Sequence, residues 1–165
     1  MPGRPRRTTR RAARRPRPVT VGVRRLPGNH DLPLPEKATS GSSGIDLRAC
    51  VDRAVRLPPG GRRLIPTGFA FAIPAGYEGQ VRPRSGLAIR QGLTMLNTPG
   101  TIDSDYRGEV SVLAINLGGK TITLRRGDRI AQLVIAPVAG VRWRAARTLS
   151  GTRRGAGGFG HTGTR

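Results

Sequence analysis

The chain has 165 residues, 36% of them hydrophobic, and its 30 basic residues against 9 acidic ones give a net charge of +21. This length allows one domain with one core, and the apolar runs are strand-sized, too short to span a bilayer. The single cysteine, Cys50, excludes an internal disulfide and a thiolate metal site. We therefore expect a soluble protein with no membrane contact, located in the cytoplasm.

The first expected segment is a basic tail, residues 1–25, with ten arginines, four prolines and no acidic residue. Its charges repel one another and it has almost nothing to bury, so we expect it to be disordered. It lacks the apolar core of a secretory signal. Organellar targeting is the alternative to a cytoplasmic location, although the prolines would interrupt the amphipathic helix of a transit peptide. We expect nonspecific contact with nucleic acid or other polyanions. Without these ten charges, residues 26–165 keep +11 of the total +21, which favours an anionic substrate.

Residues 26–150 are expected to form one all-β domain. Short alternating or β-branched segments are separated by Gly and Pro about every ten residues, which is typical of a barrel or sandwich. No helical periodicity is evident except for a turn at 85–90. The expected strands lie in the segments GIDLRACV, RLIPTGFAFAIP, EGQVRPRSGLAIR, GLTMLNTPGTI, GEVSVLAINL, KTITLRRGDRIAQLVIAPV and VRWRA.

Several common chemistries lack the residues that they need. The two histidines, His30 and His161, cannot build an imidazole cluster for zinc. Neither Ser43 nor Ser85 lies in a nucleophile elbow. The sequence GAGGFG near the C-terminus matches GxGxxG, but no strand precedes it and no helix can follow it. A flexible Gly/Arg-rich tail explains it better than a dinucleotide site does.

Five segments combine charged, polar and glycine residues in one order along the chain. They are SSGIDLRA (42–49), RPRSGLA (82–88), GTIDSDYRG (100–108), RRGDRIAQL (125–133) and RRGAGGFGHTG (153–163). In type, order and spacing they resemble the five motifs of the homotrimeric dUTP diphosphatases (dUTPases), over roughly residues 26–165. The resemblance implies a short-stranded β-barrel or jelly-roll-like domain that assembles as a trimer, with each active site shared between chains.

The resemblance also implies an enzyme that hydrolyses dUTP to dUMP and pyrophosphate, which keeps uracil out of DNA and supplies dUMP for thymidylate synthesis. Asp103 matches the family's general base, which activates a water to attack the α-phosphorus. Tyr106 resembles the ring that packs on the deoxyribose and excludes a 2′-hydroxyl. Each has a plainer explanation, because an Asp in a turn often caps the backbone and a following Tyr often packs on a sheet. Asp105 is assigned no role.

The uracil edge should be bound by backbone groups of the hairpin around this turn, as in the family, with a side-chain contact from Asn97. Backbone contacts tolerate many side chains, so Thr101 and Ser111 are assigned by their place in the motif alone. The matching positions are Asn97, Thr101, Ile102 and Ser111.

The triphosphate should bind where a fork of donors, a hydroxyl and an accessible backbone amide occur together, because phosphate oxygens suit these groups. Arg84, Ser85 and Gly86 supply them. Gln132 resembles a further phosphate contact. Arg129 and Asp128 in the same motif are as readily explained as structural.

The C-terminal segment, residues 151–165, resembles the family's flexible lid, which closes over a neighbouring subunit's active site. Arg154 matches the residue that holds the β- and γ-phosphates, and Phe159 matches the ring that covers the base. Closure would exclude water and fix the in-line geometry. The other expected contacts in the lid are Gly160, His161 and Thr162.

Magnesium (Mg²⁺) is the cofactor that the resemblance implies, carried into the site with the triphosphate. Asp46 matches a carboxylate that contacts a metal-bound water, in keeping with an ion that retains most of its hydration. The alternative is that Asp46 caps the end of a strand.

Two other functions remain to be weighed against a dUTPase. dCTP deaminases share the fold, but their catalytic glutamate would fall at position 113, which is Leu113 here. A nucleic-acid-binding module built on the same fold is the other alternative, prompted by the arginine tail. In a binding module that had lost enzyme activity, the catalytic motifs should have degenerated. All five motifs are intact here, so the sequence predicts an active dUTPase.

Overall fold

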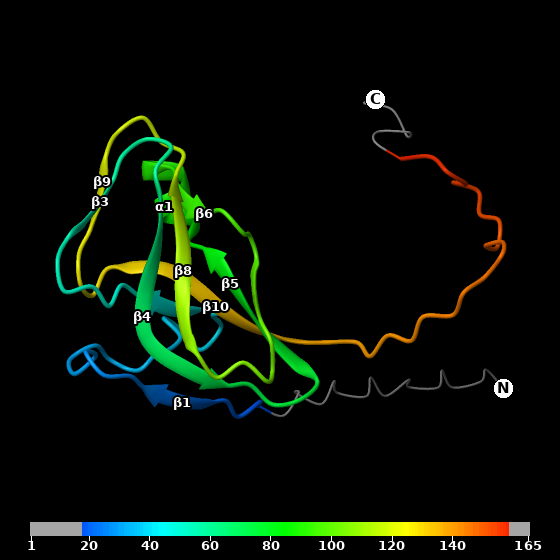
Figure 1. Cartoon of the computed structure of the whole chain (residues 1–165), viewed down its shortest axis with the longest axis horizontal. Helices are drawn as coiled ribbons and strands as arrows, with labels where there is room; N and C mark the ends of the chain where they lie inside the picture. Colours follow the sequence, from blue (N-terminus) through cyan, green and yellow to red (C-terminus); the bar gives the residue numbers. More distant parts are fainter. Residues whose placement is uncertain (1–17, 159–165) are drawn as a thin grey trace, which may run out of the picture.

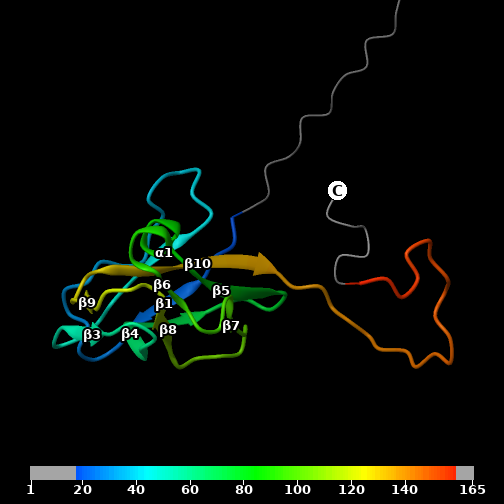
Figure 2. The same cartoon turned by 90° about the horizontal axis from the view of Figure 1, so that it is seen from above.

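The computed structural model describes residues 18–158. Two four-stranded sheets and one two-stranded sheet make up the domain (Figures 1 and 2). The elements in chain order are β1 (Gly22–Arg25), β2 (Ile45–Arg48), β3 (Val55–Leu57), β4 (Arg62–Ala72), β5 (Tyr77–Pro83), α1 (Ser85–Gln91), β6 (Leu93–Met95), β7 (Gly100–Ile102), β8 (Glu109–Asn116), β9 (Ile122–Leu124) and β10 (Arg129–Pro137).

All strand pairs between these elements are antiparallel. The first sheet has the order β1-β4-β8-β6, the second has β2-β10-β5-β7, and β3 pairs with β9. The expected all-β domain is confirmed, and the expected turn at 85–90 is the short helix α1. No helix within residues 18–158 is long and apolar enough to cross a membrane.

The core lies between the inner faces of the two large sheets. In β8 every second residue is buried, because successive side chains of a strand point to opposite faces. Ile65 and Val110 of the first sheet and Leu47 and Leu133 of the second are at most 1% exposed. Burial of each such side chain stabilises the fold by about 1.5–3 kcal/mol.

The expected boundary of the basic tail at residue 25 is wrong. Residues 22–25 form β1, which pairs with residues 69–72 of β4. The guanidinium of Arg25 lies 5.3 Å from the centre of the Phe69 ring, in a cation–π contact. The backbone of residues 22–25 thus joins the sheet, although the sequence up to Arg25 is rich in arginine. The remainder of the expected tail, residues 1–17, lies outside the described residues.

The C-terminal part of the chain leaves the domain after β10. Residues 138–158 run as an extended segment away from the sheets in both views (Figures 1 and 2). The strand expected at VRWRA is not formed within the described part of the chain, and its Trp143 is 94% exposed. A strand needs a partner, and this segment pairs with no other strand among residues 18–158.

Candidate active site

A β-bulge in β10 shapes the polar face on which the site lies. The pairing of β10 with β2 shifts between Arg129 and Ala131. As a result Ile130 and Ala131 are both buried, while Arg129 and Gln132 both point away from the core. Regular alternation would place positions 129 and 132 on opposite faces, so the bulge brings these two side chains to one surface.

Asp46 lies beside Gln132 on the neighbouring strand and binds two arginines. On β2 it is the register partner of Gln132. Its Oδ1 is 2.9 Å from Nε of Arg84, and its Oδ2 is 3.2 Å from Nη1 of Arg129. The Asp46 side chain is 19% exposed, so water screens these ion pairs only in part. Arg84 and Arg129 are therefore held in place by one carboxylate.

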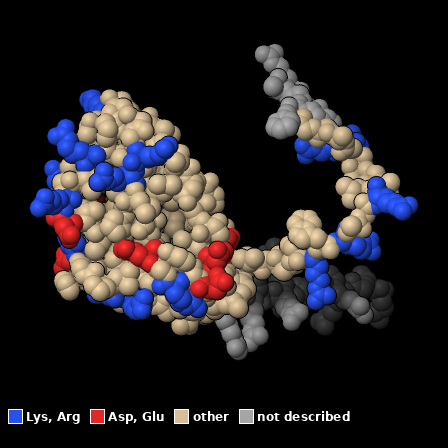
Figure 3. Space-filling model, in the orientation of Figure 1, with Lys and Arg blue, Asp and Glu red and all other residues tan. Residues whose placement is uncertain are grey.

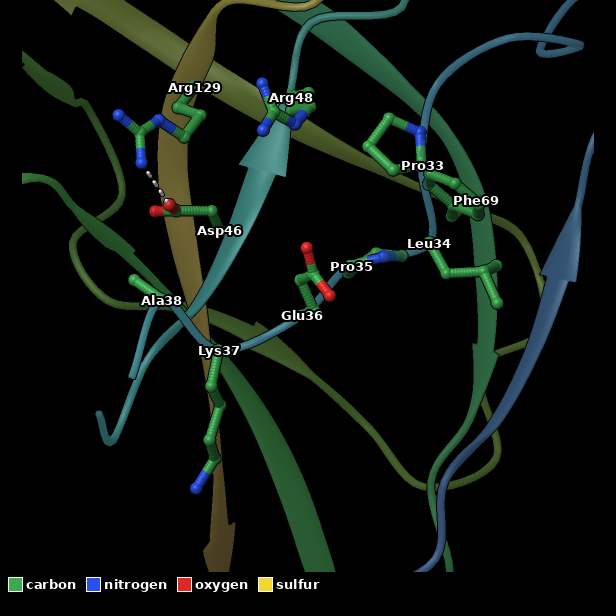
Figure 4. Close-up of a pocket in the computed structure, with 10 residues that line it drawn as sticks. All are labelled: Pro33, Leu34, Pro35, Glu36, Lys37, Ala38, Asp46, Arg48, Phe69 and Arg129. Carbon is green, nitrogen blue, oxygen red and sulfur yellow. Dashed lines mark hydrogen bonds and ion pairs between the residues drawn. The ribbon is translucent and has the colours of Figure 1, made fainter. Parts of the chain in front are cut away.

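A small hollow lies next to Asp46, under the segment 33–38 (Figure 4). In the figure the carboxylate of Asp46 faces the guanidinium of Arg129, and Arg48 lies beside them. Arg48 is already engaged, because its Nη1 donates to the carbonyl oxygen of Gly127 at 2.8 Å. This hollow of about 130 Å³ is the smaller of two cavities that Asp46 lines.

The larger cavity, of about 500 Å³, is called the Arg84 cavity below. It brings together the four residues predicted to bind phosphate, Arg84, Ser85, Gly86 and Gln132. Nε2 of Gln132 donates to the carbonyl oxygen of Pro83 at 2.9 Å, which fixes the carboxamide. The other residues that line the cavity are Ala38, Ser42, Ser43, Gly44, Asp46 and Arg90.

A second cavity, of about 310 Å³, is called the Asp103 cavity. Five residues predicted for water activation, sugar selection and uracil binding line it together with Leu64 and Glu109. The carboxylate of Asp103 is exposed and forms no hydrogen bond or ion pair within residues 18–158. The five predicted residues are Thr101, Ile102, Asp103, Tyr106 and Ser111.

The turn after β7 positions Asp103 and Tyr106. The amide of Tyr106 donates to the carbonyl oxygen of Asp103 at 3.2 Å. The Tyr106 hydroxyl donates to the carbonyl oxygen of Glu109 at 3.0 Å. The phenol also lies over Gly108, where an added Cβ would overlap it. Glycine at 108 therefore leaves the space that the tyrosine ring occupies.

Asn97 lies in the loop between β6 and β7, outside the lining of the Asp103 cavity. Its side-chain nitrogen would be 3.2 Å from a Cβ added at Gly100, so it packs beside the first residue of β7. The structure thus brings Asn97 next to the predicted uracil-binding strand without placing it in the cavity.

The two cavities share no lining residue within the described part of the chain. The Arg84 cavity lies beside β2, β10 and α1, whereas the Asp103 cavity lies beside β4, β7 and β8. Within a single chain, the predicted phosphate-binding residues and the predicted base therefore lie in different cavities.

The predicted lid residue Arg154 belongs to the extended segment 138–158. This segment leads away from the sheets (Figure 1). Arg154 is exposed, and its Nε donates to the carbonyl oxygen of Gly157 at 2.7 Å. The other predicted lid contacts lie outside the described residues: Phe159, Gly160, His161 and Thr162.

Other charged residues of the fourth motif stabilise turns. Oδ2 of Asp128 accepts a hydrogen bond from the amide of Arg125 at 2.7 Å. Nη2 of Arg126 lies 2.6 Å from Oδ1 of Asp31, and this guanidinium holds the pKa of the Asp31 carboxyl below its usual value. The structural explanation of Asp128 is thus the better supported one.

Arg90 lines the Arg84 cavity, although the motif pattern did not predict it as a site residue. The available signal was its spacing, because positions 86 and 90 lie on the same face of a helix.

The face of the domain in Figure 3 is rich in basic side chains, whereas acidic ones form a few small groups.

The dUTPase family model matches residues 30–163. A deoxyuridine 5′-triphosphate nucleotidohydrolase of Desulfotalea psychrophila is 61% identical over 80% of this chain and 88% of its own length. The same-named protein of Rhizobium meliloti is 57% identical over 86% of this chain and 89% of its own length.

Solved structures are similar as well. The dUTPase of Staphylococcus bacteriophage 80alpha with dUPNHPP has a TM-score of 0.79 and 25% identity, covering 88% of this chain and 99% of that one. A mutant dUTPase from phage phi11 of S. aureus, described with a coordinated structural Mg(II) ion, has the same fold, with a TM-score of 0.70 at 24% identity over 78% of this chain and 97% of that one. From the match over most of its length and the identity to these relatives, the chain belongs to the dUTPase family.

Proposed function

We propose that this protein hydrolyses dUTP to dUMP and pyrophosphate. The observation that supports this most strongly is the composition of the two cavities, because one contains the predicted base and sugar-selecting residues and the other the predicted phosphate-binding ones. Relatives at 57–61% identity are named deoxyuridine 5′-triphosphate nucleotidohydrolases, which fits dUTP as the substrate.

Asp103 is the proposed general base. Its carboxylate is exposed, lines a cavity and has no partner within residues 18–158, so it is free to accept a proton from a bound water. The resulting hydroxide forms a bond to the α-phosphorus, the bond from that phosphorus to the bridging oxygen breaks, and pyrophosphate leaves with the bond's electron pair. Asp103 returns its proton to solvent or product.

Uracil would bind to the backbone of β7. This strand is at the edge of its sheet, in the order β2-β10-β5-β7, so the N–H and C=O groups on its outer side are not paired by another strand of the described chain. These groups can match the donor and acceptor pattern of uracil. Cytosine reverses part of that pattern and would leave buried groups unpaired, at about 1–3 kcal/mol each.

Sugar and phosphates would be bound by side chains that hydrogen bonds and an ion pair orient. Tyr106 is fixed by its bond to Glu109 and by its packing on Gly108, so its ring can exclude a 2′-hydroxyl. Arg84 is oriented by Asp46 and Gln132 by Pro83, which reduces the ordering required when the triphosphate binds.

The proposed assembly is a homotrimer whose active sites combine cavities from different copies. The separation of the two cavities within one chain supports this. The outer face of the β4–β8–β6 sheet supports it too, because Leu64 is 63% exposed there and pairs with Leu113 across the strands. Leu64 also lines the Asp103 cavity, so a copy seated on this apolar face would cover that cavity.

The extended C-terminal segment would reach a neighbouring copy. Trp143 and Leu149 on it are at least 90% exposed, and large apolar side chains left this open favour a contact with another protein surface. We propose that Arg154 and the residues that follow it, including Phe159, then close over a neighbour's site.

Mg²⁺ would enter with the triphosphate. Residues 18–158 contain no group of three His, Cys, Asp or Glu side chains that could enclose a metal ion. This fits an ion bound mainly by water and substrate phosphates, with one protein carboxylate nearby. Asp46, beside the Arg84 cavity, is the residue proposed to contact a water of that ion. The ion would neutralise charge on the phosphates.

The remaining proposals concern the other activity of this fold and the location of the protein. A deaminase would need a carboxylate at position 113, and Leu113 on β8 supplies none. A cytoplasmic location is proposed because the single cysteine, Cys50, fits a reducing compartment.

The test is hydrolysis by the purified full chain with magnesium, following pyrophosphate release from dUTP, UTP, dTTP and dCTP, together with ammonia release from dCTP. We expect pyrophosphate from dUTP with strong preference over the other three nucleotides. Absence of dUTP hydrolysis, or ammonia release from dCTP, would overturn the proposal.

A further inference from the structure

The Asp46 carboxylate offsets one of the two positive charges that Arg84 and Arg129 bring to this surface. Arg84 and Arg129 both bind the Asp46 carboxylate, at 2.9 and 3.2 Å. Asp46 is also the only acidic residue that lines the Arg84 cavity in the described structure. A strongly anionic ligand in this cavity therefore needs a further positive charge.

Arg90 supplies such a charge. It lines the Arg84 cavity and forms no ion pair with any carboxylate within residues 18–158. The rest of the sequence, residues 1–17 and 159–165, contains no Asp or Glu that could pair with it. Its guanidinium is thus the one charge on the cavity lining that no acidic side chain offsets.

The position of this guanidinium is set by Gly86. A Cβ added at Gly86 would lie 3.0 Å from Nη1 and 3.1 Å from Nη2 of Arg90. The guanidinium therefore packs directly over residue 86, one turn earlier on α1, and next to Ser85 and Arg84. The absence of a side chain at 86 lets Arg90 fold back toward the cavity.

We infer that Arg90 is a further substrate-binding residue, whose guanidinium contacts the phosphates of dUTP alongside Arg84. This inference rests on the proposed function, because it assigns the cavity to the triphosphate. A planar guanidinium donates several N–H groups and suits phosphate oxygens. The competing explanation is that Arg90, in the last turn of α1, only complements the helix dipole.

The experiment compares Arg90→Gln, Arg90→Lys and the control Arg56→Gln in the full chain. Arg56 is an exposed arginine on β3 that lines neither cavity. We expect Arg90→Gln to raise the KM for dUTP by about tenfold with kcat nearly unchanged, because a charge-assisted hydrogen bond is removed. Arg90→Lys should recover most of the affinity, and Arg56→Gln should resemble the parent protein.

Calorimetric binding of inorganic tripolyphosphate and of deoxyuridine separates the explanations. Arg90→Gln should weaken tripolyphosphate binding by a similar factor and leave deoxyuridine binding unchanged, which a purely helical role would not produce. Equal KM values for Arg90→Gln and Arg56→Gln would overturn the inference. So would a lower Tm without any change in tripolyphosphate affinity. A parent protein that binds tripolyphosphate through Arg90 but does not hydrolyse dUTP would instead overturn the proposed function.

Discussion

The carboxylate of Asp46 lies 2.9 Å from Nε of Arg84, so a residue of the first motif orients the arginine of the second. Asp46→Asn removes the charge that holds this guanidinium, and the arginine should then sample other orientations. We expect kcat/KM for dUTP to fall about tenfold, mainly through KM. Steady-state kinetics at several magnesium concentrations would measure this.

The control for that variant is Asp52→Asn, because Asp52 is exposed and forms no hydrogen bond or ion pair in the described structure. If Asp46→Asn and Asp52→Asn had the same kcat/KM, Asp46 would have no positioning role. A changed magnesium dependence of Asp46→Asn would support its proposed contact with a metal-bound water.

Asp103→Asn should remove the proposed base without altering the turn. Assembly and nucleotide binding should persist, while kcat should fall by about 100-fold or more, because a carboxamide cannot accept the proton from water. Asp105→Asn is the matched control, since Asp105 is exposed in the same turn. A variant at position 103 with normal kcat would exclude Asp103 as the base.

Gly108→Ala should disturb sugar selection. A Cβ at this position would overlap the phenol of Tyr106, so the ring must move. We expect the ratio of kcat/KM for dUTP over UTP to decrease by about tenfold, because the space for a 2′-hydroxyl opens. Gly119→Ala is the control, because a Cβ there meets no atom within 4 Å. An unchanged ratio would mean that Tyr106 does not select the sugar.

Deleting residues 152–165 should leave the domain folded, because this end of the chain contributes no residue to the buried core within residues 18–158. Most of the dUTP hydrolysis should nevertheless disappear, since the proposed lid with Arg154 is removed. Sedimentation and dUTP kinetics on the shortened protein would test both statements. Full activity after the deletion would refute the lid.

Deleting residues 1–17 should preserve folding and the dUTP turnover at saturating substrate. Deleting residues 1–25 should lower the Tm, because it also removes β1 and the cation–π pair of Arg25 with Phe69. The shorter deletion removes eight arginines, so nucleic-acid binding should weaken. The slope of log K for DNA binding against log salt concentration should become less steep by about 0.9 for each DNA phosphate that those arginines neutralise. Identical binding and salt slopes for the parent and the shorter deletion would show that this segment is inert.

Much of the fold and of the site could be predicted from the sequence, because these features are local. The alternation of β8 gives its buried face directly, since side-chain direction in a strand has a period of two. The residue types in Arg84–Ser85–Gly86 predict phosphate binding, and those in the turn from Asp103 to Tyr106 predict carboxylate chemistry. These residues gather accordingly in two cavities. The type, order and spacing of the five motifs were sufficient to predict the family.

Partner strands and shifts of register were decided only by the tertiary structure. The charge run that ends at Arg25 suggests a solvated segment, yet its backbone pairs with β4. The alternating segment VRWRA pairs with no strand in the described part of the chain. The bulge before Ala131 turns Gln132 to the same face as Arg129, and neither pattern nor propensity specifies it. Pairing, register and the packing of one side chain over another depend on segments far apart in the chain, and folding alone brings those segments together.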